Sequence, residues 1–110
     1  MQTYYDPADL AKFGDIAEGG RDLAAKFFAY YGAALSSGAL SAREKALIGL
    51  AVAHTVQCPY CIDAFTSKCQ EEGADLEQMT EAVHVVCAVR GGASLVHGVQ
   101  MLEHARKAGM

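Results

Sequence analysis

The fold is decided by residues 40–66, which read LSAREKALIGLAVAHTVQCPYCIDAFT. Ser41 and Glu44 have the spacing of a capping box, in which two side chains satisfy the free amides at a helix start. Residues 46–53 are apolar apart from one glycine. The pattern predicts a helix from Ser41 to about Gln57, and a helix that is apolar on nearly every side must be covered on every side.

The second half of this stretch contains two cysteines that are separated by two residues, in the segment Cys58-Pro59-Tyr60-Cys61. Proline suits the first turn of a helix, which makes Cys58 the expected N-cap residue. Thiols three residues apart on one turn have Cβ atoms about 5–6 Å apart, near the range that a disulfide closes. The free amides of a helix start favour a thiolate. The pair therefore offers a nucleophile and a resolving partner, and the Tyr60 hydroxyl could hydrogen-bond a peroxide oxygen.

Two other interpretations of the cysteines stay open. Half of a tetrahedral zinc site has the same C-x-x-C spacing, but the sequence offers no second C-x-x-C and no H-x-x-x-H. Cys69 and Cys87 could complete four sulfurs, although both fall inside predicted helices. Cys69 shares the apolar stripe of Cys61, which indicates a small buried residue. We favour a redox dithiol over inert core cysteines, and we expect neither a metal ion nor a cofactor.

Start and stop signals place five further helices along the chain, and no stretch has the alternating pattern of a strand. The expected helices run from Asp6-Pro7 to Gly19-Gly20, from about Asp22 to Ser36, from Cys58 to Gly73, from Asp75 to a break at Arg90-Gly91-Gly92, and from about Ser94 to Lys107. Short connections make neighbouring helices antiparallel. The predicted fold is all-α: a six-helix antiparallel bundle forming a single domain over residues 1–110.

Composition narrows the class of protein. The 110 residues are 52% hydrophobic and 20% charged, with a formal charge of −4. This balance is too apolar for a disordered chain, too interrupted by charge for a membrane span, and has no basic surface for nucleic acid. The first residues lack a secretion leader, so we expect a cytoplasmic protein. Because a domain of this size can hardly cover its central helix alone, we also expect an obligate homo-oligomer.

Residues 40–66 resemble the core of the carboxymuconolactone decarboxylase superfamily, and specifically its alkylhydroperoxidase D-like branch, in which a C-x-x-C opens a helix. The resemblance spans about residues 20–100, and the opening YYDPADL makes the chain similar to the arsenosugar biosynthesis-associated peroxidase-like proteins. It implies an all-helical homo-oligomer, a trimer or hexamer, that reduces a hydroperoxide or disulfide with electrons from a thiol donor. It also implies that Cys61 attacks the peroxide and that Cys58 resolves the product.

The chain departs from the pattern of that family at two positions. The family has a glutamate twelve residues before the first cysteine and a histidine four residues after the second, which together relay protons to the thiols. Here those positions hold Ala46 and Phe65. His54, one turn before Cys58, is the available substitute, as a base or as the partner of a thiolate.

Glu44 is the carboxylate nearest to the usual glutamate position. It lies about 15 Å along the helix from His54, so it could act on the thiols only through water, through an induced shift of the structure, or in a site completed by another subunit. Its place in the capping box is the simpler explanation for a glutamate at this position. The candidate catalytic residues are therefore Cys58, Cys61, His54 and Glu44. The favoured function is a thiol-dependent peroxidase or disulfide oxidoreductase. The alternative is an accessory oligomer of a biosynthetic pathway whose dithiol senses redox state or carries thiols.

Overall fold

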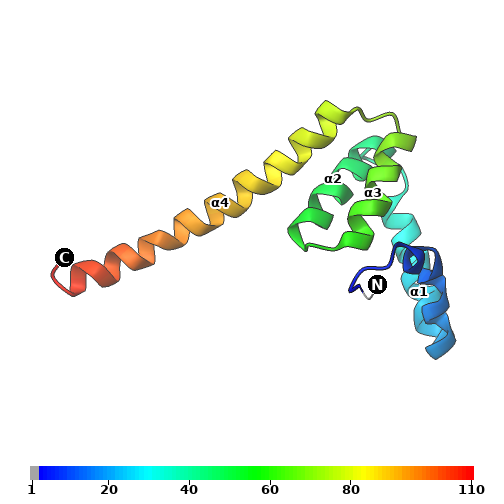
Figure 1. Ribbon diagram of the computed structural model, residues 1–110, viewed down its shortest axis with the longest axis horizontal. Coiled ribbons are helices and arrows are strands. Elements are labelled where there is room, and N and C mark those ends of the chain that lie inside the picture. The colour runs from blue at the N-terminus through cyan, green and yellow to red at the C-terminus, as the bar shows by residue number, and fades with distance from the viewer. Residues whose placement is uncertain (1–2) are drawn as a thin grey trace.

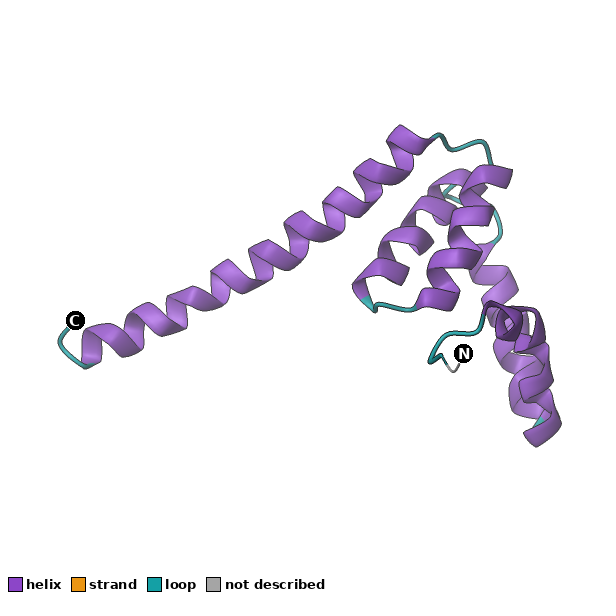
Figure 2. Ribbon diagram, viewed as in Figure 1, coloured by secondary structure: helices purple, strands orange, loops and turns teal. Residues whose placement is uncertain are grey.

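The computed structural model describes residues 3–110, and within this range the chain forms five helices and no strand (Figure 1, Figure 2). The helices are η1 (Pro7–Gly19), α1 (Arg21–Leu35), α2 (Ala42–Thr55), α3 (Pro59–Glu71) and α4 (Leu76–Lys107). The all-α prediction is confirmed.

The helices begin at the residues whose side chains can cap them. Ser41 Oγ accepts from the Glu44 amide at 3.1 Å, and Glu44 Oε1 accepts from the Ser41 amide at 2.8 Å. Asp75 and Gln78 form the same reciprocal pair at the start of α4. Each pair satisfies two amides that a helix start leaves free, which is why these starts could be predicted from the sequence.

A tight turn joins α2 to α3 and places Cys58 at the start of α3. The Cys58 amide donates to the Ala53 carbonyl at 3.1 Å, and the Gln57 amide donates to the His54 carbonyl at 3.3 Å. This is a Schellman motif, which needs a left-handed residue, and Gln57 supplies it with φ of 56°. A non-glycine residue in this conformation costs about 1 kcal/mol, so the turn is held by the packing of α2 on α3.

The core lies between α2, α3 and the first turns of α4. Its buried members are Ala46, Leu50, Cys69, Ala74 and Met79, with Leu47 and Phe65 packed against them. The Phe65 ring lies directly on the backbone of Gly49, and a Cβ at position 49 would overlap Phe65 Cε1. The close approach of the two helices therefore requires a glycine in the middle of α2.

We expect Gly49→Ala to lower the free energy of unfolding by about 1–3 kcal/mol, because the added methyl overlaps the Phe65 ring and forces α2 and α3 apart. The matched control is Gly32→Ala on α1, where nothing lies within 4 Å of the added Cβ. There the change should be neutral or stabilising by about 0.5–1 kcal/mol. Denaturant unfolding at one protein concentration measures both, and equal effects would show that the Phe65 contact does not limit position 49.

The expected break at Arg90-Gly91-Gly92 does not occur, so the prediction of six helices is wrong. The segments predicted as a fifth and a sixth helix are one helix, α4, of 32 residues. A glycine weakens a helix by about 1 kcal/mol but keeps its amide, so the hydrogen bonds of the helix continue through it. The valine-, leucine- and alanine-rich segments on both sides maintain the helix.

The first helix begins at Asp6-Pro7 as predicted, but η1 is a 3-10 helix and not an α-helix. Its apolar residues Leu10, Phe13 and Ile16 are spaced by three. Since a 3-10 helix has three residues per turn, this spacing aligns them on one side. Phe13 uses that side to contact Phe28 on α1, with ring centroids 5.0 Å apart.

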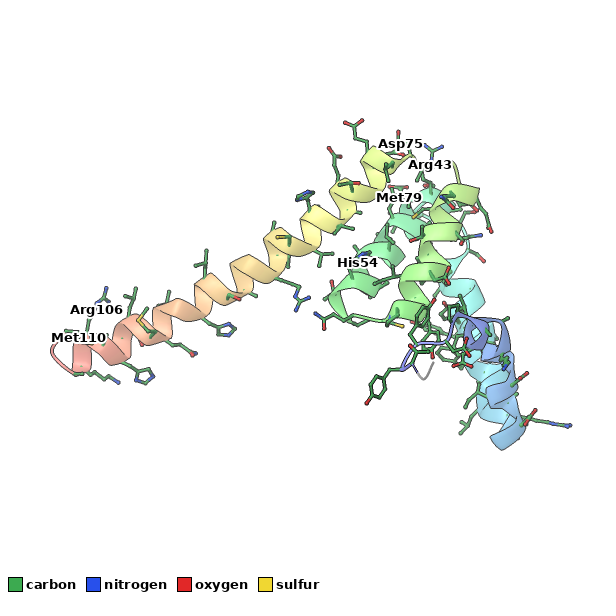
Figure 3. The ribbon with its side chains drawn as sticks, in the orientation of Figure 1. Arg43, His54, Asp75, Met79, Arg106 and Met110 are labelled. Carbon is green, nitrogen blue, oxygen red and sulfur yellow. The ribbon has the colours of Figure 1, made fainter. Side chains whose placement is uncertain are left out.

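α4 leaves the other helices after its first turns (Figure 1). It packs on α2 through Met79 and Val86, but no residue from Cys87 onward is buried. Figure 3 shows Arg106 and Met110 at its far end, away from every other element. The radius of gyration is 19.0 Å, whereas a compact chain of this length has about 13 Å. The chain is therefore extended, and the second half of α4 does not complete an antiparallel bundle.

Within the described residues, α4 is also the one helix whose length and composition would allow it to cross a membrane. Its most apolar 18-residue window has a mean hydropathy of 1.3, and 6% of that window is buried.

Candidate active site at the start of α3

Cys58 and Cys61 lie together on the opening turn of α3. Cys58 is the N-cap residue, and its Sγ accepts a hydrogen bond from the Cys61 amide at 3.2 Å. Pro59 follows at the first helical position, as the sequence predicts. Both thiols are free and half-buried. The start of the helix thus directs a backbone N–H at Cys58, an arrangement that stabilises a thiolate on that sulfur.

The two thiols have different environments. Burial, followed by a hydrogen bond with the Cys58 thiol, raises the pKa of Cys61 to about 11, although a backbone N–H acts in the opposite direction. Cys61 is therefore a neutral thiol at neutral pH. A thiol in this state can donate to a thiolate on Cys58 and can later lose its proton when a disulfide forms.

A cavity of about 420 Å³ opens in front of the thiols. Helix η1 forms one wall of it, α1 another, and the start of α3 a third. The residues that line the cavity are Asp9, Leu10, Phe13, Tyr31, Cys58, Tyr60, Cys61 and Ala64. The walls are mainly apolar and aromatic, so the cavity suits an organic molecule better than a strongly hydrated one.

Two tyrosine–aspartate pairs stand beside the cysteines. Tyr60 donates from its hydroxyl to Asp9 Oδ2 at 3.0 Å, and Tyr5 donates to Asp63 Oδ2 at 2.9 Å. The two tyrosine rings meet edge to face, with centroids 4.7 Å apart. These contacts attach the N-terminal segment to the helix that carries the thiols.

The structure does not bring His54 and Glu44 into the cavity of the thiols. His54 lies on α2 (Figure 3) and lines a separate cavity with Tyr5 and Asp63, and its Nδ1 is 2.8 Å from the carbonyl of Leu50. Glu44 lies near the opposite end of α2 as part of the capping box. The hydrogen bonds from Ser41 hold the pKa of Glu44 below its ordinary value.

The positions of the usual proton relay belong to the apolar core. Ala46 is 2% exposed, and Phe65 packs on Gly49 and against the buried cluster. A glutamate at position 46 would bring a charged group into this core, and a histidine at position 65 would replace the apolar ring that packs on α2. The apolar residues at these two positions are therefore explained by packing.

The other two cysteines are far from this chemistry. Cys69 is fully buried in the core, as its apolar stripe predicts, and Cys87 is exposed on α4. Within residues 3–110, no three side chains of histidine, cysteine, aspartate or glutamate are grouped so that they could hold one metal ion.

Asp9 is the residue of this site that the sequence did not identify. It lies 51 positions before its partner Tyr60, and no local pattern connects the two. Asp6-Pro7 predicts a helix start, but only the folded arrangement shows that the helix it begins lies beside the thiols.

An all-helical chain with a C-x-x-C at the start of a helix is the arrangement expected of the resembled family, and the comparison with family models agrees. The model of the carboxymuconolactone decarboxylase family matches residues 21–104, so the chain belongs to this family. It is also similar to a protein described as "Uncharacterized protein 4 in cox locus" from Paracoccus denitrificans. The two are 36% identical over 96 residues, which cover 87% of this chain and 86% of the relative.

Proposed function

We propose that the protein is a thiol-dependent peroxidase or disulfide oxidoreductase that works through Cys58 and Cys61. The observation that carries the proposal is the 3.2 Å hydrogen bond from the Cys61 amide to Cys58 Sγ at the mouth of an apolar cavity. This observation combines a sulfur that accepts a backbone N–H, a second sulfur on the same turn and a space for a substrate in front of both. Membership of the family supports the proposal, because the alkylhydroperoxidase-like branch carries this dithiol.

The proposed reaction with a hydroperoxide has two steps. In the first, a thiolate attacks the outer peroxide oxygen: an S–O bond forms, the O–O bond breaks, and the alkoxide leaves as an alcohol with the proton of the thiol. In the second, the other thiol attacks the sulfenic sulfur: an S–S bond forms and water leaves. Two thiols and one hydroperoxide thus give a disulfide, an alcohol and water. An external thiol then reduces the disulfide.

We propose Cys58 as the attacking sulfur, although the resemblance implies Cys61. The Cys58 sulfur accepts a hydrogen bond from the Cys61 amide at the start of a helix, and such a bond favours the thiolate form of a cysteine. The pKa of Cys61, raised to about 11, suits a resolving thiol that stays protonated until the sulfenic acid has formed.

The test is peroxide consumption with cumene hydroperoxide and dithiothreitol. The unmodified protein should exceed the rate of dithiothreitol alone, and the double variant Cys58→Ser/Cys61→Ser should fall to that rate. Cys87→Ser, which removes an exposed thiol on α4, should keep full activity. Full activity in the double variant would refute the proposal.

A second candidate function is favoured by the apolar residues at the relay positions. Without the usual relay the reaction with peroxide would be slower, so the dithiol could instead serve an accessory oligomer as a redox sensor or thiol carrier. Peroxide turnover no faster than dithiothreitol, together with rapid exchange with a small disulfide, would favour this role.

We further propose that the protein is a homo-oligomer. The chain exposes 8437 Å², whereas a compact monomer of 11.6 kDa exposes about 5,800 Å². The excess of about 2,600 Å² is enough for more than one interface, since a standard interface buries about 800 Å² on each partner.

The faces of α4 support a second copy as the partner. Val85, Val89, Val96 and Val99 recur at intervals of three, four and seven on one side and are 53 to 66% exposed. This spacing is the seam by which one helix packs on another. The groove beside α2, lined by Ile48, Val52 and Val56 among others, offers an apolar surface of matching character.

A second side of α4 argues against a lipid partner. The side that packs on α2 through Met79 and Val86 continues as Arg90, His97 and His104, which would meet the centre of a bilayer if the helix crossed one. An arginine there costs about 2.5–3.5 kcal/mol. We therefore propose that α4 packs on a protein partner. We also propose a cytoplasmic location, because the thiol pools of that compartment can reduce the dithiol.

A further inference from the structure

The proposed reaction needs a group that takes the proton of a thiol and returns it to the leaving alkoxide. The positions that supply such groups in the family are apolar here, and His54 lines a different cavity. The titratable groups around the thiols are Asp9 from η1, Tyr31 from α1 and Tyr60 from α3. Lys45 of α2 lines the groove that Cys61 also borders. Of the three groups in the cavity, Asp9 alone is a carboxylate.

Asp9 and Tyr60 both line the cavity, and one hydrogen bond joins them. Tyr60 donates its proton to Asp9 at 3.0 Å, and its oxygen accepts a hydrogen bond from the backbone of Asp6, so one lone pair is left to accept another proton. The hydrogen bond to Asp9 raises the pKa of Tyr60, so the hydroxyl stays protonated at neutral pH. Burial and the nearby thiols also raise the pKa of Tyr31, but within residues 3–110 no carboxylate accepts a hydrogen bond from the Tyr31 hydroxyl.

On the basis of the proposed peroxidase function, we propose that Tyr60 and Asp9 form the proton relay of the dithiol. As the attacking thiol ionises, its proton passes to the Tyr60 oxygen and the Tyr60 proton passes to Asp9. When the O–O bond breaks, Tyr60 gives a proton to the alkoxide and Asp9 returns its proton to Tyr60. The thiol proton thus ends on the alcohol, and both residues return to their starting states. Asp9 acts only through Tyr60 and is a positioning residue.

This relay differs from that of the family in the part of the chain that supplies it. Asp9 lies outside residues 21–104, the part of the chain that the family model matches. The N-terminal helix η1 would therefore contribute to the chemistry itself, in addition to covering the cavity.

The test measures the rate at which iodoacetamide alkylates Cys58 and Cys61, resolved from the exposed Cys87 by peptide mapping. The rate of oxidation by cumene hydroperoxide is measured separately, and both are followed from about pH 6 to about pH 10. Tyr60→Phe keeps the aromatic ring, and Asp9→Asn keeps the shape of the side chain. Near pH 7 both variants should react about 100-fold more slowly, the usual contribution of a positioned acid–base group. Their rates should approach that of the unmodified protein near pH 10, where the thiolate forms without help. A loss of structure would instead expose the half-buried thiols and speed their alkylation, so it gives the opposite change.

Tyr5→Phe is the matched control, because it removes the other tyrosine–aspartate hydrogen bond, which lies outside the cavity of the thiols. It should follow the unmodified protein, and Asp9→Glu should restore most of the rate near pH 7. Coincident alkylation profiles for the unmodified protein, Tyr60→Phe and Asp9→Asn would overturn the relay, as would a loss confined to His54→Ala. Failure of the peroxidase function has a different signature: alkylation responds to the variants, while the unmodified protein and the double cysteine variant react equally with peroxide.

Discussion

Cys58→Ser and Cys61→Ser are each expected to reduce peroxide turnover to the rate of the buffer thiol. The cycle needs both sulfurs, because one carries the oxygen and the other forms the disulfide that the external thiol reduces. The 3.2 Å contact between the Cys61 amide and Cys58 Sγ places the two residues on one turn, and no other cysteine can substitute. Cys69 is buried in the core and Cys87 is exposed on α4.

The two single variants should differ in what they accumulate. Cys61→Ser retains the proposed attacking sulfur, so one equivalent of peroxide should leave a sulfenic acid on Cys58 that dimedone traps and mass spectrometry detects. Cys58→Ser should give little adduct near neutral pH, because Cys61 remains a thiol. The reverse pattern would assign the attack to Cys61, as the resemblance implies, and turnover by either single variant at the full rate would contradict the dithiol mechanism.

Val96→Asp is expected to dissociate the proposed homo-oligomer. Val96 lies in the middle of the valine seam of α4, and a carboxylate buried there without a partner costs about 3–5 kcal/mol. Association should weaken at least about 100-fold, which light scattering coupled to size-exclusion chromatography detects as a fall in mass.

The neighbouring residue supplies the control for this change. His97→Asp adds the same charge one position further on, but on the side that carries Arg90 and His104, and should leave the mass unchanged. A monomeric mass for the unmodified protein would contradict the oligomer. A protein that floats with lipid vesicles, and whose flotation Val96→Asp abolishes, would instead identify the partner of α4 as a membrane.

Local signals in the sequence predicted the fold well wherever a side chain meets its own backbone. Ser41, Cys58 and Asp75 cap the helices that they were expected to cap, because a cap depends on residues within one turn. Gly73, at φ of 79°, ends α3 for the same reason. The continuity of α4 through Gly91-Gly92 was not predictable in this way. Two glycines reduce the stability of a helix only slightly, and the helix-forming residues on both sides outweigh that cost.

The candidate site was predictable to a similar degree. The placement of Cys58 and Cys61 follows from Pro59 and the helix start, which are local. The placement of His54 depends on the rotation of α2 about its axis, which the packing of Phe65 on Gly49 sets and which sequence spacing does not reveal. The pairing of Asp9 with Tyr60 depends on how η1 folds back over α3, so it could be recognised only in three dimensions.

The most direct test is the mass of the fully reduced protein after one equivalent of peroxide, followed by peptide mapping. Our interpretation predicts a product that is lighter by two hydrogen atoms, with a disulfide between Cys58 and Cys61 and with Cys69 and Cys87 still available to alkylation after unfolding. An unchanged mass, or an oxidised product in which Cys58 and Cys61 both remain free, would contradict it.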